Sequence, residues 1–141
     1  MGNIHKWTEN IKTAYGKASA ALGSETSDII TTTFVNMANY DLVTFTANVT
    51  NAASGKTVTL RLWEATAAAG TSSASLAITD TFTAEATSDT DLLVAQVRAA
   101  ALSAGYQYVG AKVSTDDSSG GEIVGIQIHQ LRSRYPQSSL P

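Results

Sequence analysis

Apolar and polar residues alternate most regularly over two neighbouring stretches of the chain, residues 40–49 and 57–63. The apolar positions are Val43, Phe45, Ala47 and Val49 in the first stretch and Val58, Leu60 and Leu62 in the second. Period-two alternation places such a set on one buried face of a β-strand. The joint between the stretches contains Gly55, which is usual for a hairpin. We therefore predict two antiparallel strands at the heart of one β domain.

The same alternation predicts five further strands, over residues 29–35, 76–86, 92–98, 106–115 and 122–131. Asp80 interrupts one apolar set, which indicates a bulge near that residue. Residues 92–98 also fit the start of a helix through residue 104, but a strand followed by one short helical turn is favoured. The run D-D-S-S-G-G at residues 116–121 is the clearest turn. About seven or eight short strands separated by polar turns predict an all-β fold, an antiparallel β-sandwich or jelly roll.

The first 23 residues follow a different period. Ile4, Trp7, Ile11 and Tyr15 lie three or four residues apart, which is the spacing of one helical face, although glycines at 2, 16 and 23 weaken this interpretation. Such a partly helical arm would either dock on a neighbouring subunit or pack on its own domain. We predict three segments: an N-terminal arm (1–23), a β-sandwich domain (24–131) and a short C-terminal tail (132–141).

Charge and composition restrict the class of protein. The 141 residues carry a net charge of −3, and the nine lysines and arginines are scattered. This argues against nucleic-acid binding and against polybasic attachment to a membrane. The absence of cysteine excludes disulfides and thiolate metal sites. We expect no secretory signal and no transmembrane span, because no apolar run is long enough.

Candidate chemistry is sparse. His5 and His129 have no metal-ligand spacing, and no nucleophile elbow is present. Carboxylates gather at 89 and 91 and again at 116, 117 and 122. A weak Ca²⁺ site is one interpretation of them, but solvated turns are favoured because the EF-hand order is missing. We expect no catalytic residue, no cofactor and no bound metal, and we predict that the protein is not an enzyme.

Aromatic residues offer a binding role instead. Trp63 points outward on its predicted strand, where it would stack on a sugar ring or fill a protein interface, in which tryptophan and tyrosine are enriched. The predicted partner-binding residues are Ile4, Trp7, Ile11 and Tyr15 of the arm and Trp63, Arg132, Arg134 and Tyr135 of the surface and tail.

Three stretches together carry a resemblance to a known group of proteins. They are residues 40–49 (Y-D-L-V-T-F-T-A-N-V), 106–115 (Y-Q-Y-V-G-A-K-V-S-T) and 131–136 (L-R-S-R-Y-P). The chain resembles, over about residues 28–136, the small β head decoration (cement) proteins of tailed bacteriophages. The resemblance implies a jelly roll or sandwich, a homotrimer at local three-fold axes, the major capsid protein as partner, and no catalysis. It transfers no individual site residue.

The leading hypothesis is therefore a structural virion protein that stabilises a phage capsid by bridging its subunits. It would be located on the capsid surface, and in the host cytoplasm during assembly. One alternative is another virion part, such as a head–tail joining or tail protein. A second alternative, from a different class, is a carbohydrate-binding module that uses Trp63 and the tyrosines.

Overall fold

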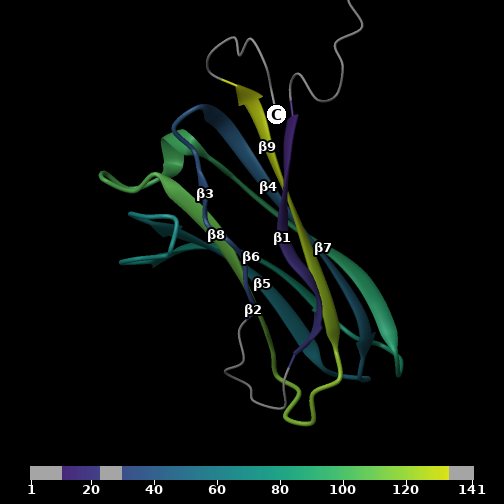
Figure 1. The fold of residues 1–141 in the computed structure, drawn as a ribbon. Coiled ribbons are helices and arrows are strands. Elements are labelled where there is room, and N and C mark those ends of the chain that lie inside the picture. The colour runs from purple at the N-terminus through teal and green to yellow at the C-terminus, as the bar shows by residue number, and fades with distance from the viewer. Residues whose placement is uncertain (1–10, 23–29, 134–141) are drawn as a thin grey trace, which may run out of the picture.

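Two antiparallel sheets pack face to face as a β-sandwich (Figure 1). The computed structural model describes residues 11–22 and 30–133. These residues form nine strands and one short 3₁₀ turn. The elements are β1 (Ile11–Ala21), β2 (Ile30–Thr31), β3 (Val35–Asn36), β4 (Tyr40–Ala52), β5 (Thr57–Ala65), β6 (Ala74–Thr83), β7 (Asp89–Arg98), η1 (Ala99–Ala101), β8 (Tyr108–Thr115) and β9 (Ile123–Ser133).

The strand order explains how the sheets are connected. Sheet A has the order β1-β9-β4-β7, and sheet B the order β2-β8-β5-β6, with β3 also paired to β8. From β4 onward the chain changes sheet at every connection except the β5–β6 hairpin. Such crossing between two sheets is the pattern of jelly-roll folds. The predicted all-β sandwich is confirmed.

The core lies between the sheets, where the alternating apolar positions meet. The fully buried side chains include the predicted inward sets of β4, β5, β7, β8 and β9. Burying each such valine, leucine or isoleucine is worth roughly 1.5–3 kcal/mol, so the repeated alternation supplies most of the fold's driving force. The inward sets beyond β4 and β5 are Leu93, Ala95, Val97, Val109, Ala111, Val113, Val124, Ile126 and Ile128.

The helix expected in the N-terminal region is wrong for the part of the chain that the structure describes. β1 is instead an edge strand of sheet A, paired antiparallel with β9 from Ile11 opposite Leu131 to Ala21 opposite Ile123. Two register shifts interrupt the pairing, and they disguise the period-two signal. At the first shift Gly16 lets the strands approach closely, since a Cβ there would lie 2.8 Å from a carbonyl oxygen of β9.

The strand predicted over residues 29–35 is divided into β2 and β3 because two side chains turn the chain between them. The Thr32 hydroxyl accepts a hydrogen bond of 2.8 Å from the Ala111 amide, in place of a backbone carbonyl. Phe34 then packs on the outer face of sheet B, against the backbones of Gly110 and Gly70. Added Cβ atoms at those glycines would lie within 2.9 Å of the ring, so glycine is required at both positions.

Asp80 connects the edges of the two sheets. Its Oδ2 accepts a hydrogen bond of 2.9 Å from the Val94 amide. A side chain of β6 thus pairs with a backbone N–H group on the open edge of strand β7. The irregularity expected near Asp80 is present a little earlier, where the β5–β6 register shifts between Arg61 and Trp63 and Ala77 has a φ of 55°. After β7, the predicted short helical turn is confirmed as η1.

The described ends of the chain lie together. Ile11 pairs with Leu131, and Ser133 pairs with Tyr40, so β1 begins where β9 ends. We name this end of the sandwich the terminal pole. The β8–β9 loop, residues 116–122, lies at the opposite end of the sandwich (Figure 1).

Candidate functional site

Half of the predicted partner-binding residues lie outside the described residues. These are Ile4, Trp7, Arg134 and Tyr135. Tyr15 in β1 and Arg132 in β9 belong to described strands, but their side chains lie outside the description. Ile11 is half-buried at the start of β1. The structure therefore places the strands that carry these residues and leaves their predicted role untested.

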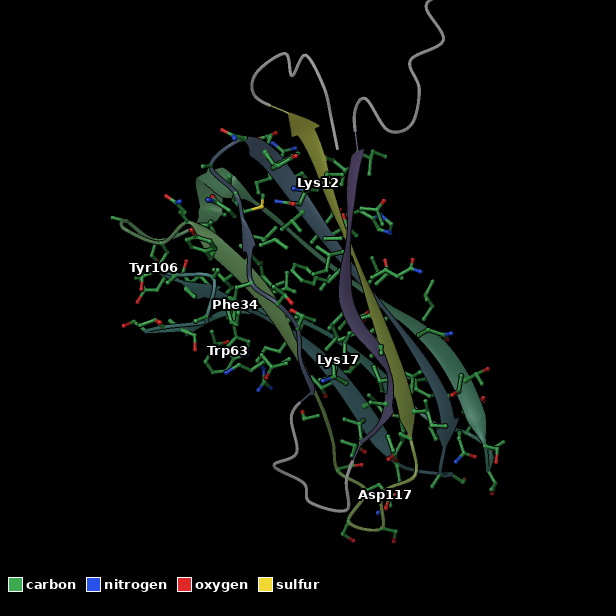
Figure 2. All side chains as sticks on the ribbon, in the orientation of Figure 1. Lys12, Lys17, Phe34, Trp63, Tyr106 and Asp117 are labelled. Atoms are coloured by element: carbon green, nitrogen blue, oxygen red, sulfur yellow. The ribbon has the colours of Figure 1, made fainter. Side chains whose placement is uncertain are left out.

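Trp63 stands on the outer face of sheet B, near Phe34 (Figure 2). The ammonium of Lys112, two positions from Gly110 on the adjacent strand, lies 3.6 Å from the centroid of the indole ring. The indole Nε1 is buried and has no hydrogen-bond partner. A sugar ring stacking on the lysine-covered face would first have to displace Lys112, so that face of Trp63 is not an open platform.

The carboxylates of the β8–β9 loop shape the turn. Asp116 accepts a hydrogen bond of 2.7 Å from the Thr57 amide, and buried Asp117 accepts one of 2.8 Å from the Ser119 amide. Glu122 is fully buried and accepts a hydrogen bond from the Thr115 hydroxyl at 3.2 Å. Within the described ranges, no three metal-ligating side chains are grouped closely enough to hold an ion. The same ranges hold no helix with the length and apolarity needed to cross a membrane.

The second carboxylate pair is also occupied by backbone amides. The amides of Glu85 and Thr90 donate to the Asp89 carboxylate at 3.0 and 2.9 Å, and these bonds lower the pKa of Asp89 below its ordinary value. Asp91 accepts a hydrogen bond of 2.7 Å from the Leu92 amide. Both carboxylates therefore stabilise the local backbone at the start of β7, as expected of turn residues.

His129 lies on the outer face of sheet A. Its Nδ1 is 3.5 Å from the Thr13 hydroxyl of β1, a long hydrogen bond between two strands that are already paired. This contact gives the imidazole a structural neighbour on the sheet surface.

A groove crosses the outer face of sheet A. Its volume is about 420 Å³, and it is open to solvent along the sheet. The lining comes from all four strands of the sheet: Lys17 of β1, Gly125, Ile126 and Gln127 of β9, Thr46 and Asn48 of β4, and Leu92 of β7. We name this feature the sheet A groove.

The same face carries the most exposed large apolar side chains of the described residues. These are Leu92, Val94 and Ile123, with exposed fractions of 55, 46 and 41%. Leu92 pairs with Asn48, Val94 with Thr46, and Ile123 with Thr50, so all three border the groove or its continuation. The sheet A face thus combines amides, hydroxyls and aliphatic groups, which are the components of a binding surface.

Comparison with protein families and with curated proteins gives no match. Solved structures are similar at the level of the fold. The CBM22-2 xylan-binding domain of Paenibacillus barcinonensis Xyn10C is 12% identical, with a TM-score of 0.50, over 93% of this chain and 94% of that one. A chain of infectious bursal disease virus, Gx strain, is 13% identical, with a TM-score of 0.51, over 89% of this chain. A chain of the cyanophage Pam1 capsid asymmetric unit is 18% identical over 94% of this chain and 92% of that one, with a TM-score of 0.46.

These similarities establish the architecture. The chain spans only 34% of the length of the bursal disease virus chain, so it corresponds to one part of that protein. The viral and xylan-binding neighbours share a β-sandwich with this chain, and they are compatible with either a structural or a carbohydrate-binding role. At identities this low they assign neither role.

The sheet A groove was missed by the sequence analysis. The alternation correctly placed Thr46 and Asn48 on the water-facing side of their strand, but it does not reveal that β9 and β7 are the neighbours of β4. One signal was available: Leu92 and Val94 are apolar residues in the outward phase of a strand whose inward phase is Leu93, Ala95 and Val97. Apolar residues on both faces of an edge strand indicate that the outer face contacts another molecule or segment.

Proposed function

We propose that the protein is a non-catalytic structural component of a virion, which decorates a tailed-phage capsid and bridges its subunits. The observation that carries this proposal is the terminal pole. Antiparallel pairing of β1 and β9 brings residue 11 and residue 133 to one end of the sandwich. Residues 1–10 and 134–141 are joined to the domain at that end.

The sequence of these two segments fits attachment to a protein surface. The first contains Ile4 and Trp7, and the second contains Arg134 and Tyr135. Tryptophan, tyrosine and arginine are the residue types that dominate binding energy at protein interfaces. A capsid subunit that contacts the terminal pole would meet both segments, and burying each large apolar side chain would contribute roughly 1.5–3 kcal/mol. The rest of the sandwich would project from the shell, and a homotrimer on a local three-fold axis would multiply these contacts.

The test is cosedimentation with heads assembled from any major capsid protein that the same genome encodes. The full chain should sediment with the heads, and a chain lacking residues 1–10 should stay largely in the supernatant. Trp7→Ala should weaken binding about tenfold or more, as interface tryptophans do. Thr59→Ala, on the outer face of β5, is the matched control. Equal sedimentation of all four proteins would contradict attachment through the terminal pole.

The alternative of a head–tail joining or tail protein uses the same surface and predicts a different location. Gold-labelled protein added to intact virions separates the two, because decoration covers the whole shell whereas a joining or tail protein labels one vertex or the tail.

A further inference from the structure

The polar side chains of the sheet A groove have unused hydrogen-bonding capacity. They are the Thr46 hydroxyl and the amides of Asn48 and Gln127. Within residues 11–22 and 30–133, none of these three side chains forms a hydrogen bond. Each amide offers two donors and one acceptor, so the groove presents both kinds of group to solvent.

The sheet register arranges these groups in rows. Asn48 pairs with Gly125 on one side and Leu92 on the other, and Thr46 pairs with Gln127 and Val94. Asn48 and Gln127 are therefore diagonal neighbours on adjacent strands, about 7 Å apart in such ladders. This spacing is comparable to one sugar ring. Gly125 adds no side chain to the floor between them, while Leu92 supplies an aliphatic wall.

We propose that the sheet A groove binds a carbohydrate chain. Sugar hydroxyls both donate and accept hydrogen bonds, and amide and hydroxyl side chains match them in both capacities. The C–H faces of sugar rings are apolar and would pack against Leu92 and Val94.

Other occupants fit the groove less well. An extended peptide adds to a sheet edge through backbone hydrogen bonds, but this groove lies on a sheet face whose backbone is paired within β9 and β4. A purely apolar partner would bury both amides without partners, which costs binding free energy. A sugar chain forms hydrogen bonds with the amides through its hydroxyls and packs its apolar ring faces against the aliphatic wall.

This site lies on a sheet face, separate from the terminal pole, so it is independent of the proposed capsid attachment. It also differs from the sugar platform that the sequence predicted at Trp63, which stands on the outer face of the opposite sheet.

The test is titration of the ¹⁵N-labelled full chain with xylohexaose, a neutral probe, and with hexagalacturonate, an acidic probe. We expect the side-chain amide signals of Asn48 and Gln127 to shift with at least one probe. Asn48→Ala and Gln127→Ala should each weaken that binding about tenfold. Gly125→Leu should abolish it by filling the floor. Thr59→Ala, on the outer face of the opposite sheet, is the control that leaves the affinity unchanged, and melting curves verify that each variant is folded.

Three results would overturn the proposal. One is the lack of any shift at Asn48 and Gln127 with either probe up to about 10 mM. Another is binding that both amide variants retain. The last is a change in the oligomer mass of Asn48→Ala or Leu92→Ser, measured by analytical ultracentrifugation. Such a change would show that this face is a contact between copies of the chain. Head cosedimentation of the same variants should be normal, so failure at the groove is distinguishable from failure of the capsid proposal.

Discussion

Removing β1 should unfold the domain, whereas removing the residues before it should not. Deletion of residues 1–22 takes away the strand that covers the edge of β9 and also Leu22, which is only 2% exposed. Truncating a buried leucine alone costs about 2–5 kcal/mol. Loss of the partly buried Ala14 and Ala20 and of the β1–β9 hydrogen bonds brings the total to about 5 kcal/mol or more, a large part of a typical stability of about 5–15 kcal/mol.

Scanning calorimetry on two truncations and one substitution measures this. With about 4 °C per kcal/mol, deletion of residues 1–22 should lower the melting temperature by about 20 °C or abolish the transition. Leu22→Ala should lower it by about 8–20 °C, and deletion of residues 1–10 should change it by less than about 2 °C. If the longer deletion melts within a few degrees of the full chain, β1 is not an integral strand and this reasoning is refuted.

Three further predictions concern single side chains. Phe34→Ala should destabilise the domain by about 3–5 kcal/mol in urea unfolding, because the ring fills the space over Gly110 and Gly70; a loss below about 1 kcal/mol would show that the ring is dispensable. Asp80→Ala should cost about 0.5–1.5 kcal/mol, because water replaces the carboxylate at the Val94 amide, and it should speed amide hydrogen exchange there; unchanged exchange would contradict the bond. Because hydrogen bonds from Glu85 and Thr90 depress the pKa of Asp89, its contribution to stability is present above the unfolded value near pH 4 and is lost as pH falls through the lower folded value. Asp89→Asn should therefore make the free energy of unfolding depend less on pH in the acid range. An unchanged pH dependence would contradict this.

Much of the sandwich could be predicted because its strands have large inward residues on one phase and polar ones on the other. Val43, Phe45 and Ala47 illustrate this, and the structure buries all of them. β1 was not predicted because its inward positions include Ala14 and Gly16, which are too small to give a clear hydrophobic pattern. Ile11 and Tyr15 lie four residues apart by coincidence, and this spacing imitated a helix. Two register shifts further disrupt the alternation that a regular strand would show.

The proposed binding surfaces were harder to predict than the strands. Periodicity indicates which face of a strand a residue occupies, but it does not indicate which strands are neighbours in the sheet. A groove is formed by residues of neighbouring strands, so periodicity alone does not predict it. Asn48 and Gln127 are 79 positions apart, yet the β4–β9 register places them diagonally. The contact between the Lys112 ammonium and the Trp63 ring likewise joins two neighbouring strands. It covers one face of an indole that the sequence predicted to be open to solvent.

The opposite ends of the sandwich have a practical consequence. Polypeptide fused before residue 11 or after residue 133 would emerge at the terminal pole, and a guest sequence inserted into the β8–β9 loop would emerge at the other end. Ser118 is exposed, whereas Asp117 and Glu122 on either side are buried. Under the proposed attachment to a capsid, an epitope placed at Ser118 would point away from the shell, and the particle would become a regular antigen array whose spacing is set by the capsid lattice.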